Sequence, residues 1–186
     1  MIIIKDNDTV YFADPTGYAL VTACGDSLWD KHEENLNVWK IPNDDNIIVG
    51  VNPYSGLSAD LFRYDPDFVR GELTMQKLML EVVPKIKNRL KKYGKTKENG
   101  TIKDAFCFAQ GDRAFVIRPS WDCDCVDRFE VSGYNQVSLS ALRVSEGMPP
   151  EERLRFVAET IQAERKKLLF PLVVINTKTC KPYFLK

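Results

Sequence analysis

The sequence predicts a layered α+β sandwich, with two β-sheets in the middle and helices on the outside. Short β-branched and aromatic runs, typical of antiparallel strands, occur in three blocks along the chain. Two blocks with helical periodicity separate them, and no internal repeat is evident. With 186 residues, 44% of them hydrophobic, the chain can form one compact domain over residues 1–186.

The first block of strands begins at the first residue. Residues 1–5 and 9–13 are apolar runs, and Asp6-Asn7-Asp8 between them is a turn composition, because Asn and Asp side chains bond to their own backbone. A β-hairpin is therefore predicted here. Further apolar runs bounded by Gly, Pro, Asn or Asp predict strands over residues 18–23, 38–41 and 47–51.

Helical spacing begins near Ser55 and becomes clear in a second helix. Pro84 should start, kink or split this second helix, because proline lacks the N–H that an inner turn needs. The polar residues 91–100 that follow are predicted to form a loop. The apolar positions are Leu57, Leu61 and Tyr64 in the first helix and Leu73, Leu78, Leu80, Val83, Ile86 and Leu90 in the second.

The second half repeats this alternation. Residues 102–110 and 113–118 are joined by Gly111-Asp112, a strong hairpin signal. The helix predicted over residues 150–169 has acids in its first turn, where the helix dipole favours them. The other predicted elements are a strand over 128–131, a helix over 136–145, and closing strands over 172–176 and 182–185.

The balance of charge argues against several classes of partner. The chain has 26 basic and 26 acidic side chains, so no excess of positive charge favours nucleic acid or an anionic membrane. One basic stretch lies at the end of the second helix, where cations complement the helix C-terminus, and only Tyr93 is near it for base stacking. We expect no nucleic-acid partner. The stretch comprises Lys85, Lys87, Arg89, Lys91, Lys92, Lys95 and Lys97.

No apolar run approaches the roughly 20 residues of a membrane helix, and the N-terminus turns acidic too soon for a signal peptide. A cytoplasmic location without membrane contact is therefore expected. The five cysteines lack the paired spacing of a disulfide framework or zinc ribbon, so reduced thiols are expected. Cys123 and Cys125 are weak candidates for a metal site, since no second pair or nearby His completes four ligands. We expect no metal and no cofactor.

Several segments together resemble the proteasome β-subunit and HslV peptidase family of N-terminal nucleophile hydrolases. Residues 10–14 (VYFAD) resemble the family's second strand, which ends in a buried aspartate. Residues 38–42 (VWKIP) and 46–51 (NIIVGV) resemble the strand pair before the first helix, and Ser58-Ala59-Asp60 its start. Residues 131–142 fall where the family has its Gly-Ser-Gly turn and third helix, and residues 172–178 resemble a late core strand.

This resemblance implies a four-layer αββα sandwich and a defined chemistry. Family members use the α-amino group of a processed N-terminal threonine as general base for its own hydroxyl. A lysine assists the proton transfer, and an aspartate positions the lysine. The family fold does not by itself carry the activity, so each site position has to be compared with this sequence.

Most of these site positions do not match. Met1 has an amine but no nucleophile, and the large Ile2 should prevent removal of Met1 by aminopeptidase. Asn37 stands where the lysine is expected, and Lys40, three residues on, is expected in the strand. Gly133 stands where the family serine supports the nucleophile, and Lys166 replaces a usual aspartate. Asp14 alone is retained, although an aspartate here can also cap the turn at Pro15-Thr16-Gly17.

The leading hypothesis is a proteasome-like protein without threonine-type peptidase activity, acting as a structural or binding subunit in an assembly of identical or related subunits. Catalytic residues act as a unit, so a missing nucleophile already removes the covalent route. The alternative is an active hydrolase whose nucleophile is exposed by processing. Thr9 is the nearest internal hydroxyl, but cutting there removes the first strand. Cys24 with His32 is another nucleophile–base pair to consider, although buried structural cysteines are more common.

Overall fold

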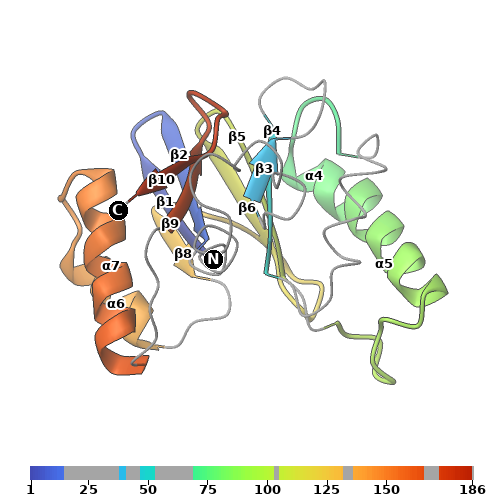
Figure 1. Cartoon of the computed structure of the whole chain (residues 1–186). Coiled ribbons are helices and arrows are strands. Elements are labelled where there is room, and N and C mark those ends of the chain that lie inside the picture. Colours follow the sequence, from blue (N-terminus) through green and yellow to red (C-terminus); the bar gives the residue numbers. More distant parts are fainter. Residues whose placement is uncertain are drawn as a thin grey trace.

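The computed structural model describes residues 1–14, 38–40, 47–52, 69–102, 105–131, 136–165 and 172–185. These residues form a mixed α+β structure with two antiparallel sheets of five strands each, as predicted from the sequence (Figure 1). The β1 sheet has the order β10 (Tyr183–Leu185), β9 (Leu172–Asn176), β2 (Thr9–Asp14), β1 (Ile2–Asp6) and β8 (Phe129–Val131). The β5 sheet has the order β3 (Val38–Lys40), β4 (Ile47–Asn52), β5 (Ala105–Gln110), β6 (Arg113–Ile117) and β7 (Cys123–Cys125).

Helices lie on the outer side of each sheet. A helical stretch formed by α4 (Met75–Lys77), the π-helix η5 (Leu78–Val82) and α5 (Val83–Lys92) lies beside the β5 sheet (Figure 1). Helices α6 (Gln136–Val144) and α7 (Pro150–Arg165) lie beside the β1 sheet. None of the described helices is both long enough and apolar enough to cross a membrane.

Three clusters of buried apolar side chains hold these parts together. One joins α5 to the β5 sheet, a second fills the space between the sheets, and a third joins α6 and α7 to the β1 sheet. Residues 2–4 of β1 and 105–109 of β5 are buried on both faces of their sheets, and both segments are continuous apolar runs.

The alternation of side chains decides which cluster each residue joins. In β1, Ile3 faces the other sheet, whereas Ile2 and Ile4 face the helices. In β5, Phe106 and Phe108 face α5, whereas the smaller Cys107 and Ala109 face the β1 sheet. Bulky side chains therefore lie under the helix, and small ones allow the sheets to approach each other.

Both predicted hairpins are confirmed. Strand β1 pairs with β2 antiparallel, and Asn7 in the intervening turn has φ 51°, in the left-handed region that Asn tolerates. Strand β5 pairs with β6, and Gly111 at their turn has φ +60°. Glycine adopts this conformation without a steric cost.

Pro84 divides the second helix, as predicted. The five residues before Val83 form a π-helix, and Pro84 occupies the first turn of α5, where its missing N–H is tolerated. This helical stretch begins after Leu73, because Thr74 caps it by accepting a hydrogen bond from the Lys77 N–H at 3.1 Å. The prediction that Leu73 lies within the helix is therefore wrong.

Other observed element boundaries differ from the predicted ones by a few residues, and one strand was not predicted. The sequence pattern missed β7 as a separate strand, because its three residues alternate two cysteines with Asp124 at the edge of the sheet. The strand predicted over 18–23 and the helix near Ser55 lie outside the described residues, as do residues 166–169 of the last helix.

Candidate functional site

The sequence-predicted site begins with Met1, which immediately precedes β1. The Met1 side chain is only 2% exposed and packs in the cluster between the two sheets, together with Ile3 and Phe12. A methionine thioether is a weak hydrogen-bond acceptor and carries no O–H or S–H to act as nucleophile. At this position the structure therefore contains a packing side chain and an amine, but no reactive hydroxyl.

Asp14 ends the neighbouring strand β2. Ile2 pairs with Ala13, so Met1 and Asp14 are the next residues at the same end of these two strands. Asp14 also pairs with Val173 of β9. The structure therefore brings together two of the positions predicted from the family resemblance. The remaining candidates, Asn37, Gly133, Lys166, Cys24 and His32, lie outside the described residues.

Lys40, the alternative to the missing lysine, belongs to strand β3, as the sequence predicted. Strand β3 pairs with β4 at the edge of the β5 sheet. Lys40 is thus in the sheet opposite the one that contains β1, and its backbone belongs to an edge strand.

Cys107 provides a thiol in this region that the resemblance did not predict. Its thiol is completely buried in the cluster that also contains Met1. Burial raises the pKa of Cys107 to about 12, and the charge of the N-terminal amine offsets this only in part. Since the thiolate is the reactive form, Cys107 is a structural thiol at neutral pH.

An ion pair connects the two sheets near the same thiol. Arg118 follows β6, and its Nη2 lies 3.0 Å from Oε2 of Glu130, which pairs with Ile3 from the adjacent strand β8. A second contact joins Arg118 Nε to Asp124 Oδ2 at 3.1 Å. Because Glu130 pairs with Ile3 of β1, this ion pair lies beside the N-terminal strand.

Arg118 remains charged in this setting. Burial acts to lower its pKa, but the hydrogen bonds and charges of Glu130 and Asp124 outweigh burial and raise it. Sequence reasoning missed this cluster, because its residues come from different sheets and no local spacing connects them. It offers a fixed guanidinium and two carboxylates that are engaged in ion pairs, and it contains no hydroxyl or thiol.

The predicted cysteine pair lies on β7. Cys123 is half-buried and Cys125 is exposed. Burial, and then the neighbouring Cys125 and Asp124, raise the pKa of Cys123 to about 11, which disfavours the thiolate that a soft metal needs. Within the described ranges, no three His, Cys, Asp or Glu side chains are grouped so that they could hold a metal ion.

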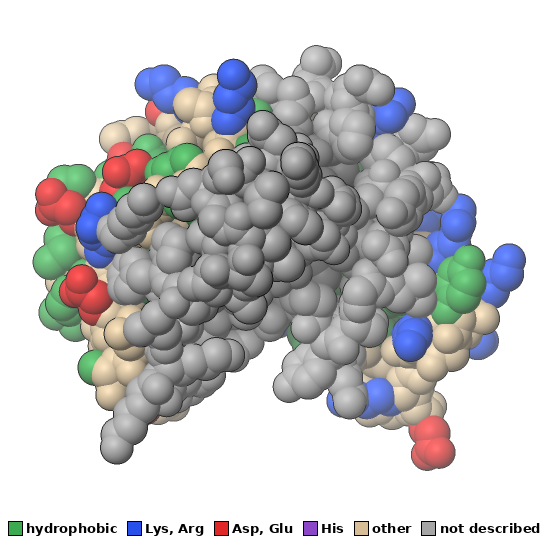
Figure 2. All heavy atoms as spheres, in the orientation of Figure 1, with side chains coloured by type: hydrophobic (Ala, Val, Ile, Leu, Met, Phe, Trp, Pro, Cys, Tyr) green, Lys and Arg blue, Asp and Glu red, His purple; other side chains and the backbone are tan. Residues whose placement is uncertain are grey.

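The basic stretch of the sequence forms one side of the molecule. Figure 2 shows Lys and Arg side chains gathered where α5 lies, on the right of the view. Most of them are exposed, and Lys87 Nζ lies 5.4 Å from the centre of the Trp121 ring. This cation–π contact and the helix C-terminus account for part of the charge without a ligand.

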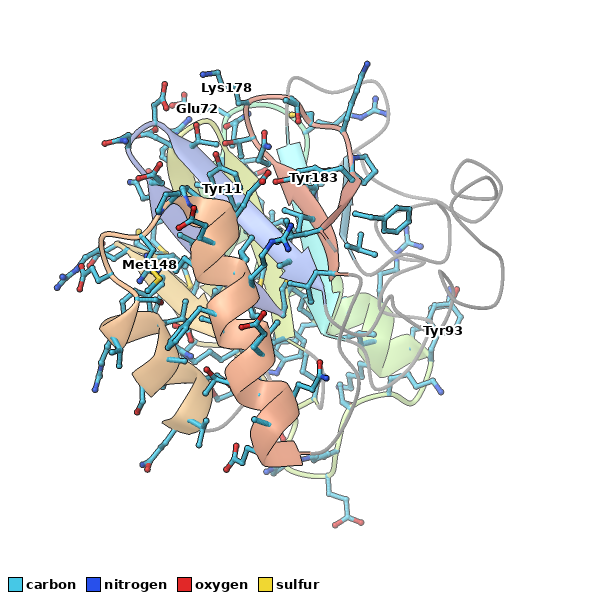
Figure 3. All side chains as sticks on the ribbon, turned by 60° about the vertical axis from the view of Figure 1, so that its left-hand side comes forward. Tyr11, Glu72, Tyr93, Met148, Lys178 and Tyr183 are labelled. Atoms are coloured by element: carbon cyan, nitrogen blue, oxygen red, sulfur yellow. The ribbon has the colours of Figure 1, made fainter. Side chains whose placement is uncertain are left out.

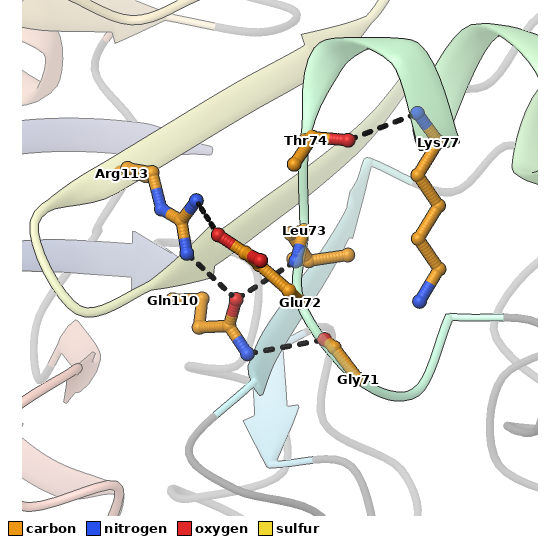
Figure 4. Close-up of polar contacts among 7 residues, drawn as sticks. All are labelled: Gly71, Glu72, Leu73, Thr74, Lys77, Gln110 and Arg113. Carbon is orange, nitrogen blue, oxygen red and sulfur yellow. Dashed lines mark hydrogen bonds and ion pairs between the residues drawn. The ribbon is translucent and has the colours of Figure 1, made fainter.

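A polar clasp fixes the segment before α4 to the β5–β6 hairpin (Figure 4). Gln110 Oε1 accepts from the Leu73 N–H at 2.8 Å, and Gln110 Nε2 donates to the Gly71 carbonyl at 3.1 Å. Arg113 donates to Gln110 at 3.2 Å and to Glu72 at 2.9 Å. The clasp is a structural device that positions the helical stretch on its sheet.

Comparison with known proteins identifies solved structures that have a similar fold. No protein-family model matches the sequence, and no curated protein matches it either. Among solved structures, Thiobacillus denitrificans BPH is similar with a TM-score of 0.69 at 12% identity, over 100% of this chain and 97% of that chain. The same protein in complex with epoxomicin gives a TM-score of 0.67 at 11% identity, over 100% of this chain and 98% of that one.

Two further structures extend the comparison. Anbu, an ancestral β-subunit from Yersinia bercovieri, gives a TM-score of 0.58 at 12% identity, over 100% of this chain and 86% of that chain. HslV from Trypanosoma brucei gives 0.52 at 10% identity, over 94% of this chain and 97% of that chain. The resemblance to the proteasome β-subunit and HslV proteins is thus confirmed at the level of the fold.

Proposed function

We propose that this chain is a proteasome β-subunit/HslV-like protein without threonine-type peptidase activity, and that it serves as a structural or binding subunit of an assembly of identical or related chains. The proposal includes the finer architecture, a four-layer αββα sandwich over the whole chain. The shared fold supports the resemblance to this family. The lack of peptidase activity has to be argued from the residues at the site.

The burial of Met1 is the observation that carries the proposal. Its side chain is packed between the sheets at the start of β1, where the resemblance implies a threonine hydroxyl. Replacing a hydroxyl by a buried thioether removes the nucleophile and gains apolar packing. The position thus contributes to stability in the way expected of a structural subunit.

One finding favours a second candidate, an active hydrolase whose nucleophile is exposed by processing. A structure of similar fold, BPH, is known in complex with epoxomicin. In this chain Thr9 is the first residue with a hydroxyl or thiol. Cleavage before Thr9 would remove β1, which lies between β2 and β8 and buries Ile2, Ile3 and Ile4. This loss of a central strand makes Thr9 a poor nucleophile position.

The test is the intact mass of the protein purified from its own source, measured before and after incubation with an epoxyketone that captures N-terminal hydroxyl nucleophiles. We expect a chain that begins at Met1 and carries no adduct. A processed chain with one adduct would overturn the proposal, and its first residue would then be the nucleophile. A purified active relative with an N-terminal threonine, treated in parallel, serves as the positive control for the reagent.

A further inference from the structure

The basic end of α5 is a surface whose charges the fold only partly uses. Residues 84–97 contain seven cations and no Asp or Glu, and the acids nearest to them in the sequence are Glu81 and Glu98. All seven cationic residues are exposed, and they belong to the group of Lys and Arg side chains on the right of Figure 2. We call this surface the α5 basic face; it comprises Lys85, Lys87, Arg89, Lys91, Lys92, Lys95 and Lys97.

The fold accounts for only some of these cations. Lys87 lies over the Trp121 ring. The helix dipole favours the three cations in the last turn of α5, which are Arg89, Lys91 and Lys92. Lys95 and Lys97 follow the helix, and neither forms an ion pair within the part of the chain that the structure describes. Their charges therefore contribute to no contact in this chain that would explain them.

The spacing of the cations within α5 also weakens the helix. Lys87 and Lys91 are four residues apart, and Arg89 and Lys92 are three apart, so each pair lies on one side of the helix. Like charges at these spacings repel each other and destabilise a helix. Exposed helix faces usually interleave charges of opposite sign, which avoids this cost. A uniformly positive face is therefore better explained by an anionic partner than by solubility.

Backbone contacts hold the α5 basic face in a defined shape. The Lys95 N–H donates to the Leu90 carbonyl at 2.9 Å, which closes the end of the helix. Gly94 makes this turn possible with φ +64°, a conformation that glycine adopts without steric cost. Trp121 Nε1 donates to the Gly100 carbonyl at 2.8 Å and so ties the following loop to the β5 sheet. A surface held in this way loses little conformational entropy on binding.

We propose that the α5 basic face binds an acidic peptide segment, a run of Asp and Glu side chains in another protein. Six of its seven cations are Lys, a point charge that suits single carboxylates, rather than Arg, whose planar fork suits bidentate contacts to phosphate. Tyr93 is the one aromatic residue of the segment, so a platform for stacking successive bases of a nucleic acid is absent from residues 84–97.

The length of the face also fits such a segment. Its helical part, from Lys85 to Lys92, is about 10 Å long, and Lys95 and Lys97 extend it. An extended peptide advances about 3.3 Å per residue, so roughly five acidic residues cover the face. The proposal goes beyond the proposed function, because binding on α5 does not depend on the chemistry of the N-terminal region.

Charge reversal tests the site separately from the net charge of the chain. Lys95→Glu/Lys97→Glu reverses two exposed cations that lie outside the helix, so the variant should fold as the wild type does. Lys178→Glu/Lys181→Glu is the matched control, because it reverses two exposed lysines in the connection between β9 and β10. Figure 3 labels Lys178 and, at the end of α5, Tyr93, which lie far apart in the view. Both double variants change the net charge equally.

The probe is a fluorescein-labelled peptide of alternating Asp and Glu residues, and the readout is its dissociation constant from fluorescence anisotropy at low and near-physiological salt. We expect the wild type to bind this peptide, more weakly at the higher salt, and not to bind a peptide with Asn and Gln in place of the acids. Lys95→Glu/Lys97→Glu should weaken binding by about tenfold, since two attractions become repulsions. The control variant should keep the wild-type affinity within about twofold.

Three results would overturn the proposal. Equal weakening in the two double variants would mean that the peptide senses only net charge. No binding by the wild type at low salt would mean that the face has no affinity for acidic peptides. Tighter binding of a single-stranded RNA of equal charge, weakened by Lys95→Glu/Lys97→Glu, would identify a nucleic-acid surface instead. None of these results depends on the epoxyketone adduct, so the two proposals fail separately.

Discussion

At the scale of single residues, burial determines which side chains of the site can react. Met1 and Cys107 belong to one buried cluster, and both contribute packing. The thiol is the more informative of the two, because its environment can be measured through its titration. Its buried position between the sheets keeps it neutral where an exposed cysteine would begin to ionise.

The first prediction concerns stability at alkaline pH. The pKa of Cys107 is raised from 9.0 to about 12 in the folded protein, so the folded state retains a proton that the unfolded chain releases. This stabilising effect is complete below about pH 9 and is lost as pH rises toward 12. In urea unfolding at pH 8 and pH 10.5, the Cys107→Ala variant should lose less stability between the two pH values than the wild type.

The exposed Cys125 provides the control for this measurement. Cys125→Ala removes a thiol from the edge of the same sheet without changing the buried cluster. Because Cys125 acts on the pKa of its neighbour Cys123, the loss of stability of this variant between pH 8 and 10.5 should differ from that of the wild type, but by less than that of Cys107→Ala does. If Cys107→Ala behaves like the wild type, the thiol is not buried in solution as the structure places it.

At the scale of elements, features that depend on neighbouring residues could be predicted from the sequence, whereas features that depend on tertiary contacts could not. The turns at Asn7 and Gly111 and the division of the helix at Pro84 could be predicted, because each depends on the chemistry of neighbouring residues. Strand β7 could not be predicted, because its pairing with β6 depends on tertiary contacts. The start of the second helix was misplaced for a related reason: Leu73 is fixed by Gln110, a residue 37 positions away.

The second prediction tests this polar clasp. Gln110→Ala leaves the partly buried N–H of Leu73 without its acceptor, which should cost about 1–3 kcal/mol in the free energy of unfolding. Gln110→Glu keeps the acceptor for Leu73 and Arg113 and replaces the donor to the Gly71 carbonyl by a carboxylate oxygen. This contact is exposed, so water can separate the two oxygens and the variant should cost less than Gln110→Ala. Urea unfolding gives both free energies.

Hydrogen exchange localises the effect of the same substitutions. In Gln110→Ala the amide of Leu73 should exchange faster, while amides in β1 keep their protection relative to global unfolding. Equal loss of stability in the alanine and glutamate variants would mean that the contact to Leu73 contributes nothing.

At the scale of the whole molecule, the mixed α+β class with two sheets followed from the sequence. Alternating blocks of strands and helices predicted mixed α+β structure with paired sheets, and the similar solved structures have the same fold. The family resemblance named Met1 and Asp14 as site positions, and the structure places them at one end of adjacent strands. It did not identify Arg118 and Glu130, because the ion pair forms only when the two sheets are stacked.

The spacing between the sheets depends on small side chains in the β5 sheet. Ala109 pairs with Ala114 of β6, and both lie in the cluster between the sheets opposite larger residues such as Phe12 and Ile175. Ala109 is completely buried, and because protein interiors are close-packed, we expect a larger side chain here to require movement of one sheet. The stacking of the two sheets should therefore be more sensitive to added side-chain volume at Ala109 than at any position on the outer surface.

The last prediction is that Ala109→Leu destabilises the protein by about 1–3 kcal/mol, the usual cost of overpacking a core. Ala163→Leu, at an exposed position of α7, adds the same three methylene-sized groups and should change stability by less than about 0.5 kcal/mol. Urea unfolding of the two variants measures both values. If they are equal, the sheets separate without cost at this point, and the small residues of β5 and β6 do not determine their spacing. A loss confined to Ala109→Leu would instead support close packing between the two sheets at this position.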